Sequence, residues 1–236
     1  MSTLRELRVF YGGTFDPVHS GHLEIARAAR DALAIDGHPV DIHMLPAADP
    51  PHRLPPGASA ADRAEMLRLA IADAPGLLLD RRELDRHAVD GRRRSWTVDT
   101  LHALRAEYGA DAPIAWLVGA DSFVGLPTWK RWPELFGLAH FIVAERQGSP
   151  IDGSLTPELA ELVAERWEQE PMALRQTPYG RLLRLHQPLQ PHSASDLRQR
   201  IAAGQPWRHL LPSAVAKYII EHRLYGCGNQ AAVPGT

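Results

Sequence analysis

The segment that most constrains this chain is a glycine turn followed by two closely spaced histidines, in the string Val9-Phe10-Tyr11-Gly12-Gly13-Thr14-Phe15-Asp16-Pro17-Val18-His19-Ser20-Gly21-His22. The apolar residues before the glycines predict a short strand over 7–11. Gly12 and Gly13 allow the backbone to turn sharply and to approach a ligand without an intervening side chain. Asp16-Pro17 and Ser20 are both helix-start signals, and the sequence leaves the first helical residue open between them.

The two histidines lie at the predicted helix start, whichever signal begins the helix. His19 and His22 are three residues apart and therefore share roughly one face. A helix N-terminus offers unpaired N–H groups and a partial positive charge, both of which suit phosphate. Imidazoles add hydrogen-bond donors and, when protonated, charge. The alternative is an ordinary strand–turn–helix with solvent-facing histidines, but the whole string favours a phosphate site and a nucleotide ligand.

The residues after this helix start predict a βαβ unit. An apolar helical face extends to about residue 34, and a glycine and a proline end the helix before a second strand over 40–45. Strands joined in this way are parallel, with a right-handed crossover. The glycine turn then lies at the carboxyl edge of the sheet, where open α/β sheets bind ligands. The turn lacks the G-x-G-x-x-G string, which disfavours a dinucleotide site of the Rossmann type.

Further apolar runs complete the predicted architecture. We expect strands over 77–79, 114–118, 141–144 and 182–185, and helices over 62–74, from 95 onward, over 195–203 and 213–222, with a peripheral helix over 158–170. The prediction is an α/β fold, a Rossmann-like open parallel sheet with helices on both faces and a small C-terminal helical part. We interpret residues 1–226 as a single domain, with the helical part at about 186–226, and residues 227–236 as a disordered tail.

The composition excludes several classes of protein. Of 236 residues, 44% are hydrophobic, and the net charge of −2 shows no basic excess that would favour nucleic acid. No window approaches the run of about 18 apolar residues that spans a bilayer, and the first residues lack the features of a signal peptide. The single cysteine, Cys227, excludes an internal disulfide and a cysteine zinc cluster. We expect a cytoplasmic protein that binds neither membrane nor nucleic acid; its oligomeric state stays open.

Two more candidate groups follow predicted strands. Arg53, in Pro50-Pro51-His52-Arg53, lies on a loop after the second strand. It is either a mobile cation for a triphosphate or a solvated loop arginine. Gly119 and Asp121 follow the strand over 114–118 at the same edge of the sheet. The Asp121 carboxylate either accepts hydrogen bonds from a ribose or caps the next helix.

Three further segments have a functional and a plain structural interpretation. Trp129, in a loop, either stacks on the flat ring of a ligand or packs against the protein. Ser95-Trp96-Thr97 opens a helix whose N–H groups either face a carboxylate or phosphate or are simply capped, with Ser95 as the candidate cap. Ser195 and Arg198, at a later serine-rich helix start, offer a hydroxyl and a guanidinium to phosphate, although capping is the commoner role of such a segment.

Together these segments resemble one enzyme family. Residues 13–22 resemble the (T/S)xxxH and HxGH signatures of the nucleotidyltransferase superfamily, in which the loop and both histidines bind the phosphates of a nucleoside triphosphate. Over about 9–226, the chain resembles the bacterial nicotinate-mononucleotide adenylyltransferases in the strings Gly-Gly-Thr-Phe-Asp-Pro-Val-His-Ser-Gly-His, Pro-Pro-His-Arg, Ser-Trp-Thr-Val-Asp-Thr-Leu, Gly-Ala-Asp-Ser, Pro-Thr-Trp and Ser-Ala-Ser-Asp-Leu-Arg. Two positions depart from the family pattern: Trp96 replaces a tyrosine, and Ala194 leaves the late motif without one side-chain donor.

The resemblance implies that the adenylyl group of ATP is transferred to nicotinate mononucleotide, giving nicotinate adenine dinucleotide and pyrophosphate, a step in NAD biosynthesis. The catalytic residues that it implies are His19, His22, Arg53 and Arg198. It implies ATP binding by Gly12, Gly13, Thr14, Phe15, His19, His22, Gly119, Asp121, Ser195 and Arg198. It implies mononucleotide binding by Gly13, Thr14, Arg53, Trp96, Thr97 and Trp129. A Mg²⁺ ion that bridges the phosphates is expected, held mostly by substrate and water, with no dedicated protein metal site.

Three other functions compete with this interpretation. A sister transferase acting on phosphopantetheine would bind an acceptor without an aromatic ring, which would leave Trp129 and the start of the helix at Thr97 without a purpose. A non-catalytic nucleotide-binding regulator would be favoured by loss of a signature histidine, and both are present. A metallohydrolase would use His19 and His22 as ligands, but the string offers no clear third ligand.

Overall fold

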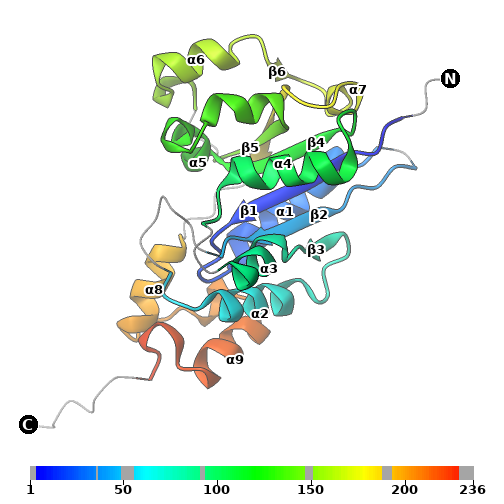
Figure 1. Ribbon diagram of the computed structural model, residues 1–236. Helices are drawn as coiled ribbons and strands as arrows, with labels where there is room; N and C mark the ends of the chain where they lie inside the picture. The colour runs from blue at the N-terminus through cyan, green and yellow to red at the C-terminus, as the bar shows by residue number, and fades with distance from the viewer. Residues whose placement is uncertain are drawn as a thin grey trace, which may run out of the picture.

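The computed structural model describes residues 4–35, 37–48, 56–90, 94–146, 151–187 and 193–228, and these contain one seven-stranded sheet (Figure 1). The strand order is β3-β2-β1-β4-β5-β7-β6, and every pair of neighbouring strands is parallel. The strands are β1 (Arg8–Gly13), β2 (Ile42–Pro46), β3 (Leu77–Leu79), β4 (Ile114–Gly119), β5 (His140–Arg146), β6 (Trp167–Glu168) and β7 (Leu182–Gln187). The direction of the strand order reverses between β1 and β4. The open parallel sheet is confirmed.

The helices connect these strands and cover the sheet (Figure 1). The α-helices are α1 (Ser20–Leu33), α2 (Ala60–Ile71), α3 (Arg82–Val89), α4 (Thr97–Tyr108), α5 (Ala120–Val124), α6 (Pro157–Val163), α7 (Ala173–Gln176), α8 (Ala194–Ala202) and α9 (Ser213–Glu221). Short 3₁₀ turns are η1 (Leu126–Thr128), η2 (Trp132–Gly137), η3 (Asp152–Ser154), η4 (Arg208–Leu210) and η5 (Leu224–Gly226). None of the helices in the described parts of the chain is both long and apolar enough to cross a membrane.

Two apolar clusters explain why helices lie on both faces of the sheet. Along β1, Val9 and Tyr11 belong to one cluster, whereas Phe10 between them belongs to the other, as the alternation of a strand requires. The first cluster takes buried residues from α1, α2, α8 and α9, and the second takes them from α4 and α6. The C-terminal helices α8 and α9 therefore pack on the same core as the first βαβ unit. The predicted coverage of both faces is confirmed.

Helix α1 begins at Ser20, which decides between the two start signals in the sequence. His19 is its N-cap residue, with extended backbone angles, and the start at Asp16-Pro17 is wrong. The buried residues of α1 recur at helical spacing and face the first cluster: Gly21, Leu23, Ala26, Ala29 and Leu33. This spacing fixes how α1 rests on the sheet, and so fixes where its N-terminus points.

The predicted peripheral helix over 158–170 is only partly correct. Helix α6 ends at Val163, and the short strand β6 follows and pairs with β7. The ring of Trp167 packs edge-on against Phe123, with 5.8 Å between centroids, so burial of this ring favours a strand at the edge of the sheet. Of the predicted tail 227–236, residues 229–236 lie outside the described part of the chain.

A buried histidine at the start of β5 links this strand to the segment before β7. His140 has no exposed surface. Its Nδ1 accepts the backbone N–H of Arg181 at 3.0 Å, and its Nε2 lies 2.9 Å from the carbonyl oxygen of Thr177. The ring is therefore neutral, with its proton on Nε2. Burial lowers the pKa of His140 from 6.5 to about 4.

This shift makes the stability of the fold depend on pH. Between pH 6.5 and 4, the unfolded chain binds a proton at His140 that the native chain does not, so this contribution is complete above pH 6.5 and is lost as the pH falls. We expect the loss to approach about 3 kcal/mol in the free energy of unfolding. Urea denaturation at a series of pH values measures it. His140→Gln should flatten this part of the curve; a slope equal to that of the wild type would contradict the assignment.

Candidate functional site

The candidate site lies where the strand order reverses, at the carboxyl ends of β1 and β4. β1 ends at Gly13 and β4 at Gly119, and the two strands are neighbours in the sheet. Helix α1 begins seven residues after β1 ends, at Ser20, and α5 follows β4 directly. The carboxyl ends of adjacent parallel strands that lead in opposite directions form a crevice in open α/β sheets. The predicted phosphate loop and the predicted Gly119–Asp121 segment therefore lie at the same edge.

The two glycines of β1 are required by close packing. A Cβ at Gly12 would lie 2.3 Å from an indole carbon of Trp116 on β4, and a Cβ at Gly13 would lie 2.9 Å from the ring of Phe15. Phe15 itself adopts a left-handed φ of 49°, and its buried ring packs edge-on against Tyr11 at 5.5 Å between centroids. The chain therefore needs both glycines to bring the loop onto the sheet.

The two signature histidines pack against each other at the start of α1. Their ring centroids are 3.8 Å apart, and Phe15 contacts the His22 ring edge-on at 5.1 Å. The Nδ1 atom of His22 accepts the backbone N–H of His19 at 3.3 Å. The neutral His22 ring therefore carries its proton on Nε2. His19 is 7% exposed, so both rings are held in place by the helix start rather than facing solvent freely.

The Asp16 carboxylate binds several of the segments that surround the predicted phosphate loop. Its position in the sequence alone did not indicate this role. Its buried carboxylate accepts the N–H groups of Gly57 and Ala58, at 2.7 and 3.1 Å, and the hydroxyl of Tyr225, at 2.8 Å. Burial, followed by the charge of Asp16, raises the pKa of Tyr225 above its ordinary value, which keeps the hydroxyl protonated as a donor. The α1 loop, the start of α2 and the C-terminal turn therefore meet at one carboxylate.

Arg198 contacts the loop after β1, and Ser195 lies beside it. Arg198 donates to the carbonyl oxygen of Asp16 at 2.7 Å and to the Ser195 hydroxyl at 3.2 Å, and its guanidinium lies 3.4 Å from the Asp16 carboxylate. The N-cap of α8 is Ser193, whose hydroxyl accepts the N–H of Asp196. Ser195 is therefore not the cap, and its exposed hydroxyl faces no competing capping role.

A second buried residue that the sequence analysis did not single out is Arg63 on α2, which has no exposed surface. Its guanidinium donates to the carbonyl oxygens of Thr14, Ala47 and Ala48, at 2.7, 2.6 and 2.9 Å. Burial lowers the pKa of Arg63, and the charge of Asp16 acts in the opposite direction. One cation therefore joins the loop after β1 to the loop after β2.

Asp121 lies in the first turn of α5, whose N-cap is Gly119. The interpretation of Asp121 as the helix cap is therefore wrong, because the cap position precedes it by two residues. Asp121 is exposed at the carboxyl end of β4. Its carboxylate lies at the edge of the sheet where the sequence analysis expects a ribose.

Two of the predicted mononucleotide residues lie on the second apolar cluster. Trp96 and Trp129 both pack partly buried against it. Lys130, next to Trp129, lies 5.3 Å from the centroid of the Trp96 ring and 3.6 Å from the carboxylate of Asp99 in the first turn of α4. The loop that carries Trp129 and the start of α4 are therefore side by side.

Ser95 is not the cap of α4, contrary to the candidate role in the sequence analysis. The N-cap is Trp96, whose N–H donates to the carbonyl oxygen of Arg94 at 3.1 Å. The Ser95 hydroxyl instead accepts the N–H of Ala48, beyond the end of β2, at 3.0 Å. The N–H of Thr97 is the first in α4 without an intrahelical acceptor, so it can face a ligand where that of Trp96 cannot.

Arg53 lies outside the described residues, as does the rest of the string Pro50-Pro51-His52-Arg53. The described residues on either side of this segment are held at the site. Ala48, which precedes the segment, is bound by Ser95 and Arg63. Gly57, which follows it, is bound by Asp16.

The comparisons with known proteins agree with this geometry. The cytidylyltransferase-like family matches residues 10–200. A probable nicotinate-nucleotide adenylyltransferase of Stenotrophomonas maltophilia (strain K279a) is 59% identical over 222 residues, which cover 94% of this chain and 98% of the relative. The chain belongs to the nicotinate-nucleotide adenylyltransferase family. A member from Xylella fastidiosa (strain 9a5c), likewise named as probable, is 50% identical over 220 residues, which cover 93% of this chain and 96% of the relative.

The fold of this family is also found among solved structures. Plasmodium falciparum nicotinic acid mononucleotide adenylyltransferase, complexed with NaAD, superposes with a TM-score of 0.70 at 15% sequence identity, covering 96% of this chain and 100% of that chain. A likeness at this identity establishes the arrangement of the strands and helices. The individual site residues are argued from the geometry above.

Arg63 provides a direct test of how the site is assembled. We expect Arg63→Met to lower the free energy of unfolding by about 3 kcal/mol, because it leaves three buried carbonyl groups without their donor and removes a cation near Asp16. Urea denaturation followed by circular dichroism measures the change.

A matched control lies one turn further along α2. Arg68 is exposed and pairs with the exposed Glu65. Arg68→Met should leave the denaturation curve of the wild type unchanged. If the two variants behave alike, the contacts of Arg63 do not hold the two loops together.

Proposed function

We propose that this enzyme joins ATP and nicotinate mononucleotide at the carboxyl edge of β1 and β4, forming nicotinate adenine dinucleotide and releasing pyrophosphate, a step of NAD biosynthesis. The observation that carries the assignment to this edge is the packed pair His19 and His22 at the start of α1, beside the glycine loop. Helix N-terminus, loop N–H groups and imidazoles together form a site for phosphate. Family membership at 59% identity identifies the acceptor.

The reaction needs no nucleophile from the protein. A phosphate oxygen of nicotinate mononucleotide forms a bond to the α-phosphorus of ATP, and the bond from that phosphorus to the bridging oxygen of the β-phosphate breaks. The electron pair leaves with pyrophosphate. Catalysis then consists of alignment of the two substrates and neutralisation of the charge that develops on the phosphates.

The β1–α1 segment is suited to the triphosphate. The proton on Nε2 of His22 is directed away from the backbone of His19, which occupies Nδ1. This proton is available for a phosphate oxygen. Arg198 and Ser195 contribute further donors at the Asp16 side of the loop, and Arg53 adds another cation. The backbone of 12–15 completes the phosphate site, and Gly119 and Asp121 bind adenosine.

The start of α4 is suited to the mononucleotide. The free N–H groups of its first turn, beginning with Thr97, receive the nicotinate carboxylate. Trp129 stacks on the pyridine ring, with Trp96 beside it. Lys130 lies at the same place, 5.3 Å from the Trp96 ring and 3.6 Å from the Asp99 carboxylate, which offsets its charge.

Mg²⁺ enters this proposal as a companion of ATP. Among the described residues, no group of three or more His, Cys, Asp or Glu side chains is arranged to hold a metal ion, and the Asp16 carboxylate is already bound by Gly57, Ala58 and Tyr225. The site thus fits an ion whose ligands are mainly phosphate oxygens and water. When bound, the ion neutralises phosphate charge.

The acceptor is tested by pyrophosphate release from ATP and Mg²⁺ with nicotinate mononucleotide, nicotinamide mononucleotide or phosphopantetheine. We expect nicotinate mononucleotide to give the highest kcat/KM by at least about tenfold, because a lost charge-assisted hydrogen bond costs about that much. Chelation of Mg²⁺ should bring release close to background. Preference for the amide would overturn the carboxylate site, and ATP binding without turnover of any acceptor would favour a regulator.

His22 is tested by its effect on turnover. We expect His22→Ala to lower kcat about a hundredfold, the loss typical of one donor to a developing negative charge, with a small effect on the KM of nicotinate mononucleotide. Steady-state kinetics in both substrates measure this. His38→Ala, at an exposed histidine beyond the C-terminal end of α1, serves as the control and should match the wild type. Near-normal turnover of His22→Ala would remove His22 from the mechanism.

A further inference from the structure

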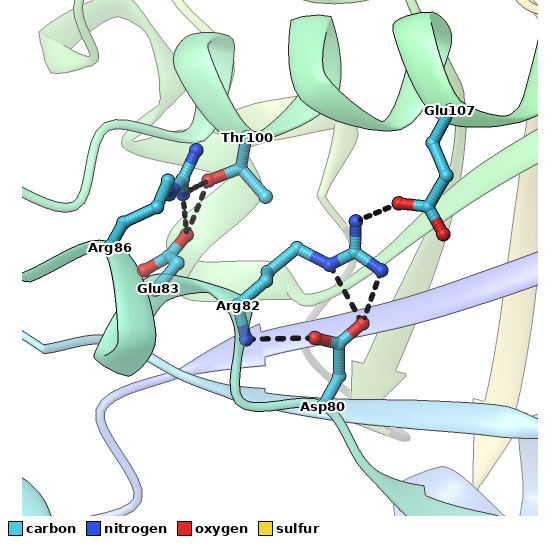
Figure 2. A network of polar contacts seen from close by, with 6 residues as sticks. All are labelled: Asp80, Arg82, Glu83, Arg86, Thr100 and Glu107. Atoms are coloured by element: carbon cyan, nitrogen blue, oxygen red, sulfur yellow. Dashed lines mark hydrogen bonds and ion pairs between the residues drawn. The ribbon is translucent and has the colours of Figure 1, made fainter.

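Helices α3 and α4 are joined by two separate polar bridges, one near each end of α4 (Figure 2). Toward the C-terminal end of α4, Arg82 donates to Glu107 at 2.8 Å and to Asp80 at 2.8 Å. Near its start, the buried Glu83 of α3 accepts the hydroxyl of Thr100 at 2.6 Å. The two bridges use similar chemistry, but only the second lies near the N-terminal end of α4, where the mononucleotide is proposed to bind.

Glu83 is a buried carboxylate that the mechanism above does not use. It is 5% exposed. Besides Thr100, the Ser95 hydroxyl favours its charged form, and Arg86 lies 3.8 Å away. Arg86 also donates to the Thr100 hydroxyl at 2.5 Å and to the carbonyl oxygen of Asp99 at 3.4 Å. Burial raises the pKa of Glu83, whereas its hydroxyl donors and Arg86 oppose that shift. Its contacts thus connect α3 with the first turn of α4.

The same carboxylate reaches the loop after β2 through one intermediate residue. The Ser95 hydroxyl is one of the groups that oppose the rise in the pKa of Glu83, and its oxygen accepts the N–H of Ala48 at 3.0 Å. The carbonyl oxygen of Ala48 accepts from Arg63 at 2.9 Å, and Arg63 also holds Thr14 in the phosphate loop. A continuous set of hydrogen bonds therefore connects the start of α4 with the phosphate loop.

We propose that Glu83 is a positioning residue for the mononucleotide: through Thr100 it holds the start of α4, and through Ser95 it holds the Ala48 peptide group beside that start. This inference rests on the proposed binding of the acceptor at α4. Glu83 itself touches no substrate. Its carboxylate keeps the start of α4 and the Ala48 peptide group at a fixed separation. Loss of the carboxylate should therefore weaken acceptor binding more than it affects the reaction at the triphosphate.

The experiment compares Glu83→Gln and Ser95→Ala with Glu107→Gln. The last variant weakens the other α3–α4 bridge, leaves Ser95 untouched and serves as the matched control. For the first two variants we expect the KM of nicotinate mononucleotide to rise about tenfold, with kcat and the KM of ATP changed less than about twofold, because misplacement of a binding surface weakens one substrate selectively. Glu107→Gln should match the wild type. Ser95→Ala removes the link to Ala48 and leaves the bond between Thr100 and Glu83 in place, so it keeps the test valid if Glu83→Gln folds poorly.

A second readout separates positioning from stability alone. Hydrogen exchange of the peptide containing Ala48 should accelerate in Glu83→Gln and Ser95→Ala, and should stay unchanged in Glu107→Gln. Equal rises in both KM values, or a lower melting temperature with unchanged kinetics, would overturn the proposal. If the wild type prefers another acceptor, the proposed function fails; a selective KM rise for that acceptor in the same variants would still support the role of Glu83.

Discussion

The site depends on two opposite charges buried beneath it. Arg63 binds carbonyl groups of the loops after β1 and β2, which lie on neighbouring strands but are far apart in sequence. Asp16 binds N–H groups at the start of α2, a C-terminal tyrosine and Arg198 of α8. Buried charges are costly unless they are paired or hydrogen-bonded, and most partners of these two are backbone groups of the loops. The loops can therefore adopt irregular paths at the edge of the sheet and still be fixed there.

The βαβ unit and its ligand edge were predictable because they depend on local patterns. Strand and helix periodicity placed β1, α1 and β2, and the rule for parallel crossovers placed the glycine turn at the carboxyl edge. The motif at His19 and His22 correctly predicted the start of a helix, but it was compatible with a first residue near Asp16 or at Ser20. Only the packing of the buried face of α1 decided for Ser20.

The remaining features depend on partners distant in sequence. Arg63 lies on the same buried face of α2 as Met66, Leu67 and Ala70. A charged residue at such a position in the sequence pattern can indicate a buried cation. Its acceptors could not be named, because they lie on two separate loops. Ser95 is of a residue type that often caps helices, but its hydroxyl accepts the N–H of Ala48, which is distant in sequence. The short strand β6 pairs with β7, which its own sequence does not reveal.

The contact between Gly12 and Trp116 has a consequence for how this sequence can vary. The indole on β4 occupies the volume that any side chain on residue 12 would need, 2.3 Å from the position of its Cβ. A substitution at residue 12 alone would push apart the two strands that flank the site. It becomes tolerable only after residue 116 has become smaller, so the order in which the two substitutions arise matters. The packing of Trp116 against residue 12 therefore constrains the loop after β1.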